Sequence, residues 1–235
     1  MPNQPFIDSL GLKVPLIVAP MAGGPSSVNL VVASSEAGAL GSIGGAYLSA
    51  EGLTAAIKAV RAITSRPFAV NLFIPGPAPV PTAADLARAV AATKKFRAAL
   101  SLPAPALAPP FAENFDRQFE VVLREKPAAF SFVFGLLDEN YLLELRRAKI
   151  FVIGTATTAE EAQALEASGV DALVAQGTEA GGHRGMFRQQ DPEPGVSAFA
   201  LLREVKAKCA LPVIAAGGIM SAAQIEAMLA AGAAA

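Results

Sequence analysis

The chain has 235 residues, a formal net charge of −1, 53% hydrophobic and 17% charged residues, and one cysteine, Cys209. Its length allows one large domain or two small ones with a substantial core. The near-zero charge and few aromatic residues argue against nucleic-acid binding. One cysteine with one histidine rules out a disulfide framework and argues against a metal site.

The amino-terminal residues 1–5 lack the basic and apolar parts of a signal peptide. Residues 14–35 carry no charge, but Pro15, Pro20 and Pro25 interrupt them. We therefore read a buried strand, a loop and a helix there, and no membrane span. We expect a cytoplasmic protein without a membrane partner, and the sequence does not indicate its oligomeric state.

Short runs that are apolar throughout recur along the chain, as is typical of parallel strands covered on both faces. We predict strands at residues 16–19, 39–43, 68–73, 129–134, 149–153, 171–176 and 212–216.

Helical patterns separate these runs. Thr158 with Glu161 predicts a capping box at the start of a helix that Gly169 closes, and Ser221 with Gln224 repeats the box. Alternating strands and helices in this order indicate a parallel α/β fold.

Seven strands, and an eighth that would begin near Ala233, predict a (β/α)₈ TIM barrel that stops before strand 8. Under this interpretation residues 1–235 form a single barrel domain of seven βα units. A doubly wound open sheet is the competing architecture.

The connection after the third predicted strand, residues 74–128, is too long for a simple crossover. Thr82 and Asp85 start a helix that reaches about Leu100, and its apolar spacing comes from two pairs, Leu86 with Val90 and Phe96 with Leu100. Proline groups flank this helix at Pro75, Pro77, Pro79, Pro81, Pro103, Pro105, Pro109 and Pro110. The segment is either a variable surface loop or an inserted cap over a site.

A second long connection, residues 177–197, holds the only histidine, His183, among glycines just after a predicted strand. Imidazole is the usual proton carrier near neutral pH, and neighbouring glycines let the backbone approach a ligand. We expect an active-site rim, although an exposed loop histidine is the simpler alternative. We expect Glu179 and Arg184 either to anchor the loop or to face solvent, and not to take part in the chemistry.

Other strand ends carry candidate binding groups. Asn71 and Gln176 are amides at the ends of apolar strands, where they either contact a ligand ring or pair with backbone. Gly217 and Gly218 precede a capped helix and suit phosphate, or form only a tight turn. Ala19, Pro20, Met21 and Ala22 follow the first strand. They either line a planar ligand or form only a connecting turn.

At these residues the sequence resembles the nitronate monooxygenase family, also called 2-nitropropane dioxygenases, from about Leu10 to its end. The most distinctive segment is Gln176–Gly185, which reads Gln-Gly-Thr-Glu-Ala-Gly-Gly-His-Arg-Gly. Four shorter motifs support it: Ala-Pro-Met-Ala-Gly, Val-Asn-Leu-Phe, Ser-Phe-Val-Phe-Gly and Ala-Gly-Gly-Ile.

The resemblance implies an FMN-bearing barrel that oxidises alkyl nitronates or nitroalkanes with O₂ to a carbonyl compound and nitrite. His183 would be the catalytic base, and Asn71, Gln176, Gly181 and Gly218 would contact the flavin. On the residues' own chemistry we add six more cofactor-binding positions, which are Ala19, Pro20, Met21, Ala22, Gly182 and Gly217.

Three other functions stay open. A related NAD(P)H-dependent flavin reductase, of quinone or enoyl reductase type, shares the glycine–histidine segment. A non-catalytic flavin-binding remnant and a flavin-free phosphate-binding barrel are the others. The family continues into an eighth strand, a phosphate-binding stretch and a helical tail, so FMN binding and turnover by these 235 residues are open questions.

Overall fold

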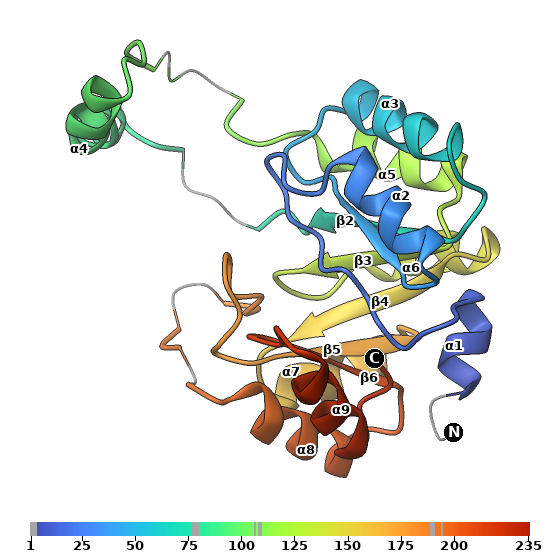
Figure 1. The fold of residues 1–235 in the computed structure, drawn as a ribbon. Helices are drawn as coiled ribbons and strands as arrows, with labels where there is room; N and C mark the ends of the chain where they lie inside the picture. The colour runs from blue at the N-terminus through green and yellow to red at the C-terminus, as the bar shows by residue number, and fades with distance from the viewer. Residues whose placement is uncertain (1–3, 77–79, 106, 108–109, 189–190, 194) are drawn as a thin grey trace.

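The computed structural model describes residues 4–76, 80–105, 107, 110–188, 191–193 and 195–235. Their strands form one parallel, curled sheet in the order β1-β2-β3-β4-β5-β6 (Figure 1). The strands are β1 (Gly41–Gly44), β2 (Phe68–Phe73), β3 (Ala129–Val133), β4 (Phe151–Ala156), β5 (Ala172–Gln176) and β6 (Val213–Ala216). The helices are α1 (Gln4–Leu10), α2 (Val28–Glu36), α3 (Ala50–Arg61), α4 (Ala83–Ala99), α5 (Phe115–Glu125), α6 (Glu139–Arg147), α7 (Ala159–Ser168), α8 (Ala198–Lys208) and α9 (Ala222–Ala230).

Sequential parallel strands with helices between them confirm the barrel prediction over the doubly wound alternative, in which strand order reverses. The larger apolar core lies between the sheet and the helices outside it. Gly154 of β4 shows how closely they pack, because a Cβ there would lie 2.5 Å from Cδ2 of Leu165 on α7. The absence of a side chain on the strand thus makes room for a leucine of the helix.

A second apolar cluster fills the amino-terminal end of the barrel. Phe6, Ile7 and Leu10 of α1 are buried there, with the first inward residues of the strands around them. The ring of Phe6 packs edge-on against Phe151 at the start of β4, with centroids 5.9 Å apart. Helix α1 therefore closes this end of the barrel.

The first predicted strand, 16–19, is only partly confirmed, because it forms a single parallel bridge, Ile17 to Leu40. Prolines at positions 15 and 20 bound the segment and supply no N–H for a longer ladder. At the other edge of the sheet, Ala234 N donates to Val213 O (2.6 Å) and Ala215 N donates to Ala235 O (2.9 Å). This pairing begins where the sequence predicts an eighth strand.

The predicted strand 149–153 was wrong at both ends, because β4 runs from Phe151 to Ala156. Helix α6 ends at Arg147 with Ala148 as its C-cap, and Lys149 adopts a left-handed φ of 59°. Ile150 N then donates to Leu145 O (3.0 Å), which belongs to the helix end. The chain therefore becomes extended two residues later than the apolar run suggests.

Both predicted capping boxes are modified. Thr158 accepts from Glu161 N, as expected, but the Glu161 carboxylate accepts from Thr157 N (2.7 Å), one residue before the cap. At α9, Gln224 likewise accepts from Met220 N instead of the N–H of its cap, Ser221. Helix α4, for which Thr82 and Asp85 were predicted to supply the start, has the complete reciprocal box.

The long connection 74–128 contains two helices. Helix α5 packs against α3 and contributes Phe119 and Val122 to the outer core. Helix α4 has no buried residue and stands apart from the barrel, on the side where the strands end (Figure 1). Pro77, Pro79 and Pro109 of the predicted proline groups lie outside the described residues.

Across the described ranges, no helix combines the length and apolar character needed to cross a bilayer.

Replacing Leu165 with Ala should lower the free energy of unfolding by about 2–5 kcal/mol, because the fully buried side chain leaves a cavity against β4. Leu143→Ala on α6, where the side chain is 42% exposed, is the matched control and should cost less than about 1 kcal/mol. Urea unfolding followed by circular dichroism measures both. Equal losses would contradict the placement of α7 on the sheet.

Candidate functional site at the carboxyl ends of the strands

Polar side chains line the barrel interior between the second apolar cluster and the carboxyl ends of the strands. The strand register sets Gly44, Asn71 and Ser131 side by side on β1, β2 and β3. Asn71 is only 4% exposed, and its Nδ2 donates to Ser131 O (3.1 Å) and Ser131 Oγ (3.0 Å). Because both bonds use Nδ2, the acceptor Oδ1 is the part of this amide that a ligand can use.

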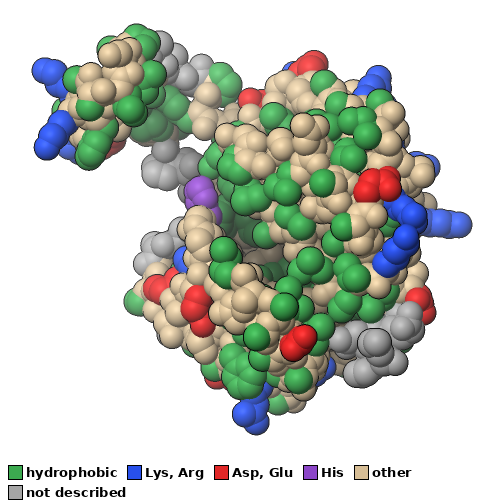
Figure 2. Space-filling model, viewed as in Figure 1, with side chains coloured by type: hydrophobic (Ala, Val, Ile, Leu, Met, Phe, Trp, Pro, Cys, Tyr) green, Lys and Arg blue, Asp and Glu red, His purple; other side chains and the backbone are tan. Residues whose placement is uncertain are grey.

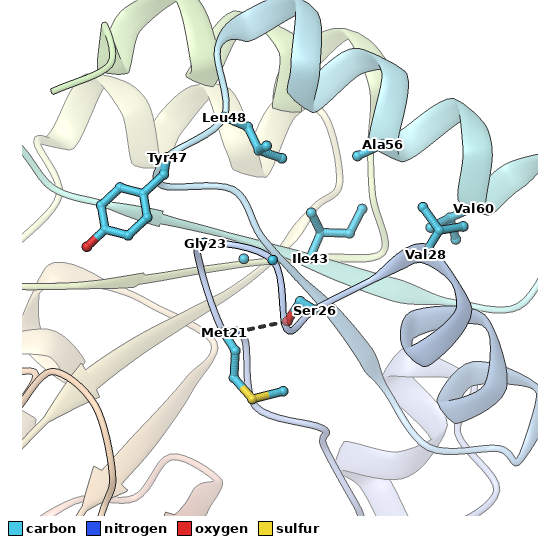
Figure 3. A pocket seen from close by; sticks show the side chains of 11 residues that line it. Met21, Gly23, Ser26, Val28, Ile43, Tyr47, Leu48, Ala56 and Val60 are labelled. Atoms are coloured by element: carbon cyan, nitrogen blue, oxygen red, sulfur yellow. Dashed lines mark hydrogen bonds between the residues drawn. The ribbon is translucent and has the colours of Figure 1, made fainter. Parts of the chain in front are cut away.

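The loop after the first strand segment folds over the end of β1. Met21 N donates to Ser26 Oγ (2.8 Å), which closes the turn (Figure 3). A Cβ on Gly44 would lie 2.6 Å from Met21 C and from Ala22 N, so only glycine lets these backbones meet. Ala19 and Pro20 lead into this turn.

A mainly apolar cavity of about 290 Å³ opens beside this loop (Figure 3). Its lining includes the exposed residues Met21, Gly23 and Tyr47, and also Val28 of α2 and Val60 of α3. The cavity thus lies between the loop after the first strand segment and helices α2 and α3.

Gln176, the last residue of β5, binds three consecutive residues of the loop that follows. Its Oε1 accepts from Gly185 N (2.7 Å) and from Arg184 Nη1 (2.9 Å), and its Nε2 donates to His183 O (3.2 Å). A Cβ on Gly185 would lie 2.8 Å from Thr155 Cγ2 on β4. The loop is therefore pressed against the inner wall of the barrel.

The imidazole of His183 lies against two phenylalanines of other strands. Its ring centroid is 5.6 Å from that of Phe73, at the end of β2, and 6.0 Å from that of Phe134, just after β3. Since His183 belongs to the loop after β5, these contacts place it across the mouth of the barrel. Figure 2 shows it at the edge of a hollow in the surface. The residue is exposed, and its ring lies against Phe73 and Phe134.

Arg184 links the loop to its own carboxyl end. Its Nε and Nη2 form a two-pronged ion pair with Glu193 (2.9 and 3.0 Å), while Nη1 and Nη2 donate to the carbonyls of Gly177 and Gln176. The arginine side chain is 17% exposed and the glutamate 37%. The hydrogen bond and the charge of Arg184 hold the pKa of Glu193 below its usual value. The loop-holding role predicted for Arg184 is confirmed.

The loops after β5 and β6 adjoin. Gly177 N donates to Ala216 O (2.8 Å), and Gly217 lies so close that its Cβ would be 3.2 Å from Gly177 O. Gly217 and Gly218 have φ values of 125° and 66°, which favour glycine. Glu179 also holds its loop, because its Oε2 accepts from Ala198 N (2.8 Å) at the start of α8.

The predicted site residues therefore gather at one end of the barrel. Met21 and Ala22 lie at β1, Asn71 inside β2, and Gln176 beside the glycines after β6. Gly181 and Gly182 lead to His183, and neither has a described atom within 4 Å of an added Cβ.

Sequence reasoning missed the residues that contact the predicted ones from neighbouring segments. Phe73 and Phe134 pack on His183, Ser131 binds Asn71, and Glu193 pairs with Arg184. The available signal was position, since Phe73 and Ser131 belong to the strands predicted at 68–73 and 129–134.

The chain is similar in sequence and in fold to known proteins. The model of the nitronate monooxygenase family matches residues 4–235. A nitronate monooxygenase of Paraburkholderia phytofirmans is 41% identical over 233 residues, covering 98% of this chain and 63% of that protein. A nitroalkane oxidase structure from Streptomyces ansochromogenes matches with a TM-score of 0.85 and 38% identity, covering 98% of this chain and 65% of that one. FabK from Thermotoga maritima matches with a TM-score of 0.71 and 29% identity, covering 97% and 58%. The chain thus spans less than two thirds of the length of each.

Glu193→Gln should lower the free energy of unfolding at neutral pH, because the ion pair with Arg184 is lost. The folded-state pKa of Glu193 lies below the ordinary value of 4.5, so its contribution is present above pH 4.5 and disappears as pH falls through the folded pKa. The difference between variant and parent should therefore shrink from pH 7 towards pH 3, as measured by urea unfolding.

Asp191→Asn is the control, because it removes an exposed ion pair with Arg188 in the same loop. It should change stability little at any pH. A Glu193→Gln effect as small as this control, or one that grows at low pH, would contradict the assignment.

Proposed function

The chain belongs to the nitronate monooxygenase family, and on this premise we propose that it uses FMN to oxidise alkyl nitronates with O₂, giving a carbonyl compound and nitrite. The observation that carries the proposal is the position of His183, the only histidine, across the mouth of the barrel against Phe73 and Phe134.

The residues at the mouth fit a flavin. Gly181 has neither a left-handed φ nor a crowding described atom that would require glycine, so close approach of a bound molecule supplies a reason for it. Oδ1 of Asn71 suits an N–H at the edge of a ring.

A phosphate fits the turn after β6. Gly217 and Gly218 precede the Ser221-capped amino terminus of α9, where backbone N–H groups suit an anion. When bound, FMN would supply the electron-accepting chemistry.

His183 is the proposed base for neutral nitroalkanes. Removing the proton from the carbon next to the nitro group leaves an electron pair that the nitro oxygens stabilise, and the imidazole takes the proton. For a substrate that enters as the nitronate, no proton is removed, and the same side chain holds the anion as a hydrogen-bond donor. The rings of Phe73 and Phe134 lie beside the imidazole.

His183→Asn should leave FMN binding nearly intact and slow oxidation of neutral nitroalkanes by about 10²–10⁴-fold, which is the usual contribution of a general base. Oxidation of pre-formed nitronates should fall less, because no proton transfer is required. Nitrite release from both substrate forms, measured on the same preparations, provides the comparison. Equal activity of variant and parent on neutral nitroalkanes would remove the base assignment.

The purified chain should show flavin absorbance after incubation with FMN, and anaerobic addition of a nitronate should bleach it. NADH should bleach it slowly or not at all. Rapid bleaching by NADH and none by a nitronate would instead favour a flavin reductase. A protein that stays colourless with added FMN would favour a phosphate-binding barrel without flavin, and bound FMN without nitrite release would favour a non-catalytic remnant.

A further inference from the structure

The backbone around His183 has unusual freedom. Gly181 and Gly182 precede it and Gly185 follows after one residue, so few side chains restrict its φ and ψ angles. The imidazole nevertheless has a defined place against Phe73 and Phe134, whose rings also contact each other. Contacts outside the glycine segment must therefore fix the loop.

The contacts that do so converge on the amide of Gln176. This amide forms hydrogen bonds with His183 O, Arg184 Nη1 and Gly185 N. One side chain therefore holds the peptide groups on both sides of Arg184. These bonds exist only when Oε1 faces the arginine and Nε2 faces the His183 carbonyl. A flipped amide would set its NH₂ group against two donors.

Arg184 selects that orientation, because a guanidinium only donates hydrogen bonds and so requires Oε1 to face it. The same guanidinium also donates to Gln176 O and Gly177 O, which ties it to the end of β5. Glu193 accepts from its remaining edge in a two-pronged pair, which fixes the plane of the fork.

We propose that Arg184 and Glu193 are positioning residues that act through Gln176 to hold His183 over the barrel mouth. This inference rests on the proposed function, in which His183 contacts the substrate. Neither residue takes part in the chemistry. Each affects the reaction only by fixing the position of the imidazole.

The single histidine makes the test direct. In a chain freed of any histidine-containing tag and grown with ¹⁵N- and ¹³C-labelled histidine, every imidazole NMR signal belongs to His183. Because Phe73 and Phe134 lie beside the ring, its Hε1 and Hδ2 shifts should carry ring-current displacements. Phe134→Leu should change them and so calibrates the measurement.

Arg184→Met and Gln176→Glu should move both His183 shifts towards the values of free histidine while circular dichroism shows a folded protein. Glu193→Gln should move them part of the way. Gln176→Glu is informative because a carboxylate still accepts from Arg184 and Gly185 but cannot donate to His183 O. Asp191→Asn in the same loop is the matched control and should leave them unchanged.

Kinetics then separates positioning from stability. Measured well below their unfolding temperatures, Arg184→Met and Gln176→Glu should lose about 10- to 100-fold in kcat for neutral nitroalkanes, as expected when a base is displaced. Arg184→Lys should not rescue activity, because an ammonium cannot reproduce the planar fork.

Folded variants with the parent's imidazole shifts would overturn the positioning role, whatever their activity. If Arg184→Met does not fold, Glu193→Gln and Gln176→Glu decide by the same shifts. If His183→Asn keeps full activity, the base assignment fails, and the imidazole shifts still decide whether Arg184 and Glu193 place the ring.

Discussion

The site depends on the shared direction of the strands. Because every strand of the sheet runs parallel to its neighbour, all the carboxyl ends meet at one edge, and each following loop starts there. Helix α1 fills the opposite end with Phe6, Ile7 and Leu10. This common direction brings residues that are distant in sequence to one opening, among them Met21, Asn71, His183 and Gly217. Local sequence alone could not specify that arrangement.

Within this opening, Asn71 on β2 is held by the strand register, whereas the glycine segment before His183 depends on contacts from other segments. The register places Asn71 beside Ser131 and leaves the amide little choice of partner. The glycine segment before His183 has no such restraint of its own and takes its shape from Gln176 and from the rings of Phe73 and Phe134. A rigid wall therefore supports a loop whose glycines leave room for a ligand.

Much of this arrangement could be predicted from the sequence. Apolar runs identified the strands, because buried parallel strands carry no polar alternation, and Thr158 and Gly169 marked both ends of α7. The left-handed Lys149, the shifted partner of Glu161 and the single bridge at Ile17 could not be predicted, since each depends on a neighbour's backbone. For the site, His183 and Gln176 were visible in a distinctive segment. Phe73, Phe134 and Glu193 were not, because their roles come from contacts across the fold.

Helix α4 has a consequence for how the sequence can diverge. None of its residues enters the core, and its own capping box and the ion pair between Arg88 and Asp85 sustain it locally. Substitutions on this helix therefore carry little folding penalty for the barrel. Substitutions that the tightly packed strands would not tolerate can accumulate on this helix while the scaffold stays the same.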